Sequence, residues 1–244
     1  SVLLRPEDVE PAWQRAIAAG GRVTHNRVLA ETVVEIDYAV TLLTVRTDGP
    51  DGPALSFCEP IGHRQVDGGV LESWQPQQMS EAALGAAKSV AARMVRALGG
   101  RGVFGVEVLV RGDEVYFSDV SVRPHDSGLV TLRTQRLSEF ELHARAVLGL
   151  PVDAIMISPG AAAVWYSGAE SAEETTGPLG DRPDPAGVLA DVLEVPESDV
   201  RIFGHHEGAA QRRLGLALAT AGDVTTARDR VRRASTALRK LWHP

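Results

Sequence analysis

Two acidic residues on the arms of a predicted β-hairpin are the first candidates for chemistry. Glu107 lies in the apolar run 103–110 and Asp119 lies in the run 115–120, with turn residues between the runs. A three-residue turn would place both carboxylates side by side on one face, whereas a two-residue turn would place them on opposite faces. Adjacent carboxylates are costly unless a cation lies between them, and Mg²⁺ prefers carboxylate oxygens. The alternative is a strand face that points to water.

A polar cluster follows the second arm directly, in the stretch Ser121-Val122-Arg123-Pro124-His125-Asp126-Ser127-Gly128. The guanidinium of Arg123 can hold a phosphate oxygen beside a metal ion, because it donates two parallel hydrogen bonds. The carboxylate of Asp126 can accept hydrogen bonds from a substrate amine or hydroxyl. The alternative is a loop whose polar groups cap one another.

Two further segments combine polar with aromatic residues. Residues 62–65 and 72–78 are rich in amide and aromatic side chains, which favours a binding loop over a core, although a single histidine such as His63 is more often structural. Arg212 and Arg213 precede an apolar strand, and adjacent arginines suit a phosphate monoester. The nearby run 205–207 (His-His-Glu) has no third ligand at a suitable spacing, so it does not indicate zinc.

Several helices and strands must position these residues. Apolar residues at helical spacing, bounded by capping residues and glycines, predict helices over 6–19, 80–98, 137–148 and 223–242. Apolar runs predict strands over 27–31, 38–46, 103–110, 115–120 and 214–218. The segment 167–185 is rich in Gly, Pro, Ser, Thr and acidic residues, which predicts an exposed loop.

Composition limits the class of protein. The 244 residues are 44% hydrophobic and 23% charged, which is typical of a folded domain and excludes a disordered or fibrous chain. A net charge of −7 argues against nucleic-acid binding, and no apolar run reaches the ~20 residues of a membrane helix. The single cysteine, Cys58, and the lack of a signal-peptide pattern predict a cytoplasmic protein. With two lysines in the chain, a phosphate site is expected to consist of arginines.

Taken in order, these segments resemble one family. The stretches that carry the resemblance to formate-dependent phosphoribosylglycinamide formyltransferase, an ATP-grasp enzyme of purine biosynthesis, are 31–34, 41–45, 62–65, 72–80, 97–100, 104–107 and 123–126. The sequences Glu-Ser-Trp-Gln-Pro-Gln-Gln and Arg-Pro-His-Asp are long and unusual, which makes the resemblance specific. It runs along the whole chain and is weakest between residues 155 and 199.

The resemblance implies an α+β fold. Residues 1–152 would be the C-terminal part of an ATP-grasp domain, a mainly antiparallel sheet with packed helices, and residues 153–244 a small C-terminal α+β domain that contacts the substrate phosphate. It implies a homodimer that formylates phosphoribosylglycinamide with ATP, formate and Mg²⁺ through formyl phosphate. It also implies that an N-terminal domain and a phosphate loop lie outside this chain, so the isolated chain is expected to be inactive.

The resemblance also implies a role for each matching residue. ATP would be bound by Glu31, Thr32, Val33, Val34 and Ala39, and the metal ion by Glu107 and Asp119. Arg123 and Asp126 would be catalytic, and the substrate would be bound by Asp126, His205, Arg212 and Arg213. The chain departs from the family at four positions: Ala39 replaces an acidic residue, Asp119 a glutamate, Val122 a proline and His205 a lysine.

Two alternatives remain open at this point. The first is another carboxylate–amine ligase, or a carboxylase, with the same fold and a different substrate. The second is a non-catalytic ATP-grasp binding module that has kept the fold and lost turnover, which the departures at Ala39, Asp119 and His205 favour.

Overall fold

The chain forms two compact units, Ser1–Ile36 and Asp37–Pro244. The computed structural model describes residues 3–18, 27–49, 52–66, 69–167, 184–203 and 212–242. None of the described helices is both long and apolar enough to cross a membrane.

The first unit contains one helix and one extended segment. The short helix η1 (Pro6–Asp8) leads into α1 (Val9–Ala18), which confirms the predicted helix. The backbone N–H groups of Leu4 and Arg5 donate to the carboxylate of Asp8, which fixes the start of η1. Residues 27–36 form neither helix nor strand, so the strand predicted over 27–31 is wrong. A strand requires a hydrogen-bonded neighbour, and the described part of this unit contains no other strand.

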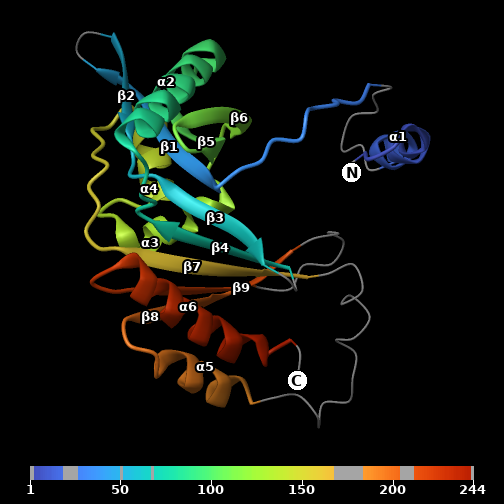
Figure 1. The fold of residues 1–244 in the computed structure, drawn as a ribbon. Helices are drawn as coiled ribbons and strands as arrows, with labels where there is room; N and C mark the ends of the chain where they lie inside the picture. Colours follow the sequence, from blue (N-terminus) through green and yellow to red (C-terminus); the bar gives the residue numbers. More distant parts are fainter. Residues whose placement is uncertain are drawn as a thin grey trace. The chain divides into compact units, whose positions relative to one another are not determined.

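The second unit is built on a nine-stranded antiparallel sheet (Figure 1). Its strands lie in the order β6-β5-β1-β3-β4-β7-β9-β8, and β2 pairs with the far half of β1. Their bounds are β1 (Tyr38–Gly49), β2 (Gly52–Phe57), β3 (Ile61–Val66), β4 (Val70–Gln75), β5 (Gly102–Arg111), β6 (Glu114–Ser121), β7 (Gly160–Tyr166), β8 (Ser198–Ile202) and β9 (Arg213–Thr220).

Helices cover both faces of this sheet. On one face, α2 (Glu81–Leu98) packs on β1, β5 and β6, and α6 (Val224–Arg239) packs on β7 and β9 beside α5 (Pro185–Leu193) (Figure 1). The opposite face is covered by η2 (Asp126–Val130), α3 (Thr131–Thr134) and α4 (Glu139–Val147). Odd-numbered residues of β1, such as Leu43 and Val45, face this second group of helices, whereas Val40 and Leu42 face α2.

The predicted helices of the second unit are confirmed, and local capping explains their bounds. The hydroxyl of Ser80 accepts a hydrogen bond from the N–H of Ala83 at the start of α2, and Gly99, with φ of 72°, ends that helix. Ser138 caps α4 through a capping box with Glu141, and Asp223 caps α6.

Other expectations have different outcomes. The strands predicted over 38–46, 103–110, 115–120 and 214–218 are confirmed. Of the predicted loop 167–185, residues 168–183 lie outside the described residues, and α5 begins at Pro185. The binding loop expected between residues 62 and 78 is wrong for much of its length, because β3 and β4 form a hairpin there and β4 is buried throughout. A single sheet runs past residue 152 through the β4–β7 pairing, and the domain division at that residue stays a prediction.

Candidate active site

The β5–β6 hairpin places Glu107 directly opposite Asp119. Its turn has two residues, because Arg111 pairs with Glu114. A regular two-residue hairpin would place Glu107 opposite residue 118, which is the outcome that separates the two carboxylates. A register shift next to Glu107 changes this pairing. Val108 still pairs with Phe117, whereas Glu107 pairs with Asp119 and not with residue 118.

Ser118 is therefore the extra residue of a β-bulge. Bulges re-aim side chains and are frequent beside functional sites. The two-residue turn was one of the alternatives, but the expectation that it separates the carboxylates is wrong because of the bulge. Asp119 is exposed and the Glu107 side chain is 22% exposed, so both carboxylates are accessible to a cation.

The loop after β6 is fixed on the same face of the sheet as Glu107. The imidazole Nε2 of His125 lies 3.3 Å from Oε1 of Glu107, and its Nδ1 lies 2.9 Å from the hydroxyl of Ser127. That hydroxyl donates to Oγ1 of Thr41 over 2.8 Å, and Thr41 is the partner of Glu107 in the β1–β5 ladder. Gly105 allows the close packing, because a Cβ at that position would lie 3.2 Å from Cβ of His125.

Asp126 joins this loop to the two strands beyond β4. Its carboxylate accepts a hydrogen bond from the hydroxyl of Tyr166 on β7 and lies 3.5 Å from the guanidinium of Arg213 on β9. Burial and the bond to Asp126 raise the pKa of Tyr166, so its hydroxyl keeps its proton and remains a donor. The Arg213 guanidinium also lies over the ring of Phe203, 5.3 Å from its centre.

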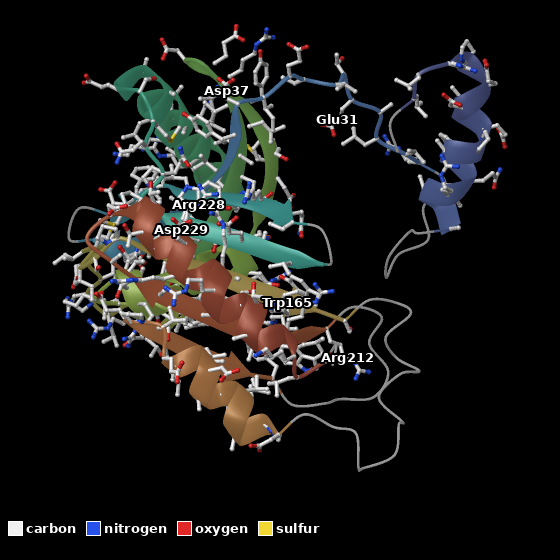
Figure 2. All side chains as sticks on the ribbon, turned by 60° about the horizontal axis from the view of Figure 1, so that its bottom comes forward. Glu31, Asp37, Trp165, Arg212, Arg228 and Asp229 are labelled. Atoms are coloured by element: carbon white, nitrogen blue, oxygen red, sulfur yellow. The ribbon has the colours of Figure 1, made fainter. Side chains whose placement is uncertain are left out.

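The remaining predicted residues lie as follows. Arg212, labelled in Figure 2, is partly buried. Its backbone N–H donates to the hydroxyl of Ser167 over 3.0 Å. Arg123 is exposed, and its guanidinium donates to the carbonyl of Pro124. Ala39 lies on β1, on the same face as Thr41. His205 lies outside the described residues, so its predicted role is not addressed by the structure.

The segment predicted to bind ATP belongs to the first unit. Residues 31–33 are exposed and Val34 is partly exposed, all in the extended stretch that precedes β1. Figure 2 shows the side chain of Glu31 on this stretch. Their role in ATP binding stays a prediction.

Sequence reasoning missed two residues of the site, Tyr166 and Glu139. Tyr166 reaches Asp126 because β4 pairs with β7, and a long-range pairing leaves no local signal in the sequence. Glu139 is fully buried, and its Oε2 accepts the N–H of His125 over 2.9 Å. Its position after the capping residue Ser138 is typical of an exposed acidic residue at a helix start, which concealed it.

A buried carboxylate also lies on the opposite face of the sheet. Glu72 on β4 is 2% exposed and accepts hydrogen bonds from Arg64, Arg228 and Arg232 over 2.6, 3.0 and 3.2 Å. The guanidinium of Arg228, a residue labelled in Figure 2, stacks on the ring of Trp74 and lies 3.7 Å from the ring centre. These contacts join α6 to β3 and β4, away from the Glu107–Asp119 pair.

Two family profiles match the sequence and define the class of protein. The sequence profile of the ATP-grasp domain matches residues 1–140, and that described as "PurT, C-terminal" matches residues 187–238. The chain belongs to the ATP-grasp family. The solved ADP complex of purK, N5-carboxyaminoimidazole ribonucleotide synthetase, has the same fold, with a TM-score of 0.71 and 23% identity over 96% of this chain and 56% of that chain.

Within that family, the chain is similar to formate-dependent phosphoribosylglycinamide formyltransferase. The relative of that name from Corynebacterium efficiens is 56% identical over 98% of this chain, and the one from Burkholderia thailandensis is 52% identical over 99%. The solved glycinamide-RNase-transformylase T from Mycobacterium tuberculosis is 56% identical, with a TM-score of 0.73 over 86% of this chain and 58% of that chain. The predicted resemblance is confirmed. The chain spans 57% of the length of both curated relatives.

Proposed function

We propose that this chain is part of an enzyme that formylates the amine of phosphoribosylglycinamide, using ATP and formate. The observation that carries the proposal is the placement of two groups on one face of the sheet: the opposed carboxylates Glu107 and Asp119, and the ion pair of Asp126 with Arg213. The two carboxylates suit a metal ion bound to a triphosphate, and the Asp126–Arg213 pair suits a substrate that carries both an amine and a phosphate. The similarity to enzymes named for this reaction supports the same assignment.

Glu107 and Asp119 are the residues that would hold Mg²⁺. Among the described residues no group of three or more His, Cys, Asp and Glu is arranged to bind a metal. Two opposed carboxylates nevertheless fit Mg²⁺, which is usually bound by one or two carboxylates together with waters and substrate phosphates. The ion would neutralise charge on the nucleotide phosphates.

Asp126 is proposed to receive the substrate amine. In the reaction, a formate oxygen bonds to the terminal phosphorus of ATP and ADP leaves, giving formyl phosphate. The amine then bonds to the formyl carbon, loses a proton and expels phosphate. Asp126 is positioned by Tyr166 and Arg213 and can hold the amine and accept its proton, and Arg123 can hold a phosphate oxygen.

The substrate phosphate is proposed to bind at Arg212 and Arg213, with His205 in the position of the family's lysine. Arg213 extends from the start of β9, and Phe203 packs against its guanidinium. A guanidinium held by packing loses less entropy when it binds an oxyanion. A homodimer in the cytoplasm completes the proposal, following the family resemblance.

Replacement of Glu107 tests the metal assignment. In the full-length protein, Glu107→Gln is expected to lower formate-dependent ADP release at least a hundredfold, because one of two carboxylate ligands is lost. Glu114→Gln, at the exposed end of the same hairpin, is the matched control and is expected to stay within twofold of wild type. The readout is ADP release in a titration with Mg²⁺. Undiminished turnover of Glu107→Gln would contradict the assignment.

A further inference from the structure

The carboxyl group of Glu139 lies beneath the loop that joins the two halves of the candidate site. Its side chain is fully buried, and Oε2 accepts the N–H of His125 over 2.9 Å. His125 contacts Glu107 on one side of the site, and the next residue, Asp126, contacts Tyr166 and Arg213 on the other. One carboxyl group therefore supports the backbone at the junction between the metal side and the substrate side.

The loop is shaped to fit this carboxyl group. A Cβ at Gly128 would lie 2.1 Å from Oε2 of Glu139, so a side chain at position 128 and the present position of Glu139 exclude each other. The hydroxyl of Thr131 donates to the carbonyl of Gly128 and accepts the N–H of Glu139, which ties the start of α4 to the loop. The present position of Glu139 therefore requires glycine at 128.

We propose that Glu139 is a positioning residue, which holds His125 and Asp126 in the arrangement required by the proposed formyl transfer through a hydrogen bond to the backbone. The inference rests on the proposed function for its kinetic consequence. Its structural part, the support of the loop, stands on the contacts alone. The hydrogen bond that the Glu139 carboxyl group accepts among the described residues comes from the backbone of His125, so we infer that it acts through the loop.

The protonation of Glu139 follows from the same surroundings. Burial and, to a smaller extent, the carboxylate of Asp126 raise its pKa to about 8, although the N–H of His125 and the guanidiniums of Arg213 and Arg123 oppose the rise. Its other oxygen, Oε1, is buried without a hydrogen-bond partner. Glu139 also acts electrostatically on the buried Cys58, whose thiol stays protonated because burial raises its pKa to about 11.

At pH 7 the group is therefore mostly neutral, and its Oε2 accepts the N–H of His125 without adding charge. Above about pH 8 a buried negative charge develops next to Asp126. Like charges repel in a poorly hydrated site, and the ionised form leaves one of its oxygens unsolvated. The loop is expected to lose its arrangement as pH rises through this range.

Three variants of the full-length protein test the proposal. Glu139→Gln keeps an oxygen acceptor for His125 and cannot ionise, Glu139→Ala removes the acceptor, and Gly128→Ala displaces the carboxyl group. Glu114→Gln, at an exposed position of β6 outside this loop, is the matched control. The first readout is the hydrogen exchange of the His125 amide, which requires no activity. The second is kcat/KM for phosphoribosylglycinamide between pH 6 and pH 9.

The expected results distinguish support of the loop, which amide exchange reports, from the effect on the reaction, which kcat/KM reports. Amide exchange at His125 should accelerate at least tenfold in Glu139→Ala and Gly128→Ala and stay near wild type in Glu139→Gln. The value of kcat/KM should fall at least tenfold in the first two variants. In Glu139→Gln it should stay within threefold of wild type at pH 7, and the decline of wild type above pH 8 should be reduced.

Two outcomes would overturn the inference, and a third would overturn the proposed function. Unchanged exchange of the His125 amide in Glu139→Ala and Gly128→Ala would show that the carboxyl group does not hold the loop. A Glu139→Gln variant with the activity loss of Glu139→Ala would show that the hydrogen bond to His125 is not its contribution. A wild type without formate-dependent ADP release would contradict the reaction, and the exchange result would still decide the support of the loop.

Discussion

Glu72 and Glu139, the two glutamates that are buried in the part of the chain the structure describes, show how surroundings decide the charge of a side chain. Both are at most 2% exposed, so burial disfavours the ionised form of each. Around Glu72, burial is the largest single effect, but the hydrogen bonds from Arg228 and Arg64 and the charges of Arg228 and Arg232 together outweigh it and hold its pKa below the usual value. Around Glu139, one N–H and two more distant guanidiniums do not outweigh burial, and its pKa rises. Glu72 is therefore an anion that links α6 to β3 and β4, whereas Glu139 is mostly neutral at pH 7.

Glu72→Gln is expected to destabilise the protein by about 1–3 kcal/mol at pH 7, because the guanidiniums lose a charged acceptor. Since the folded-state pKa of Glu72 is depressed, its stabilisation is present above the usual carboxyl pKa and is lost as pH falls through the folded-state value. The difference between wild type and variant should therefore shrink below about pH 4.

Urea denaturation at pH 7 and at pH 3.5 measures this difference. Glu194→Gln is the control, because Glu194 is exposed and its replacement should change stability by less than about 0.5 kcal/mol. An equal loss of stability for Glu72→Gln at both pH values would mean that the ionised form of Glu72 contributes nothing.

The helix α6 depends on its first turn. Asp223 accepts the N–H of Thr226 over 2.8 Å and the hydroxyl of the same residue over 2.7 Å. Asp223→Ala is expected to cost about 1 kcal/mol in the free energy of unfolding, because the cap of a helix that packs on β7 and β9 is lost. Asp223→Asn keeps an oxygen acceptor for the N–H of Thr226, so it should lower the free energy of unfolding by only a few tenths of a kcal/mol. Urea midpoints measure both, and equal midpoints for Asp223→Ala and wild type would contradict the cap.

The β5–β6 hairpin shows what the sequence can and cannot predict about an element. The alternation of apolar residues and the turn residues predict both arms correctly. The placement of Asp119 opposite Glu107 depends on one extra residue, Ser118, because a bulge sets two residues of one strand opposite one residue of its neighbour. No local pattern marks Ser118, so sequence reasoning left the placement of the two carboxylates open.

The strands β3 and β4 were harder to predict for a different reason. Their polar residues are typical of a loop, yet Glu72 and Gln75 are buried, and each has a hydrogen-bond partner from a segment elsewhere in the chain. Helices α2, α4 and α6 were predictable because caps and helical spacing are local. The residues that sequence reasoning missed are those whose environment is created by long-range pairing.

The second unit holds its candidate site together through the continuity of one sheet. Glu107 lies on β5, Tyr166 on β7 and Arg213 on β9, and the intervening strands β1, β3 and β4 link them by hydrogen-bonded pairing. The loop that carries His125 and Asp126 lies across this sheet, on the face covered by η2 and α4. The site therefore depends on the whole unit 37–244 being folded.

This organisation predicts how the 244-residue chain responds to truncation. Every strand of the sheet lies within residues 37–244, and residues 1–36 form a separate compact unit. Removal of residues 1–36 is expected to change the Tm by less than about 3 °C, because no strand loses a neighbour and no core residue of the sheet is removed.

Removal of residues 224–242 provides the contrast. It deletes α6, whose Ala227, Val231, Ala234 and Leu238 are fully buried against β7 and β9, and with it the Arg228 contact to Glu72. Exposure of that apolar face is expected to abolish cooperative unfolding, since a fully buried Val or Leu side chain contributes about 1.5–3 kcal/mol. Calorimetry of both truncated chains measures the Tm and the cooperativity of unfolding. A large fall in Tm on removal of residues 1–36 would show that the sheet depends on the first unit for its stability.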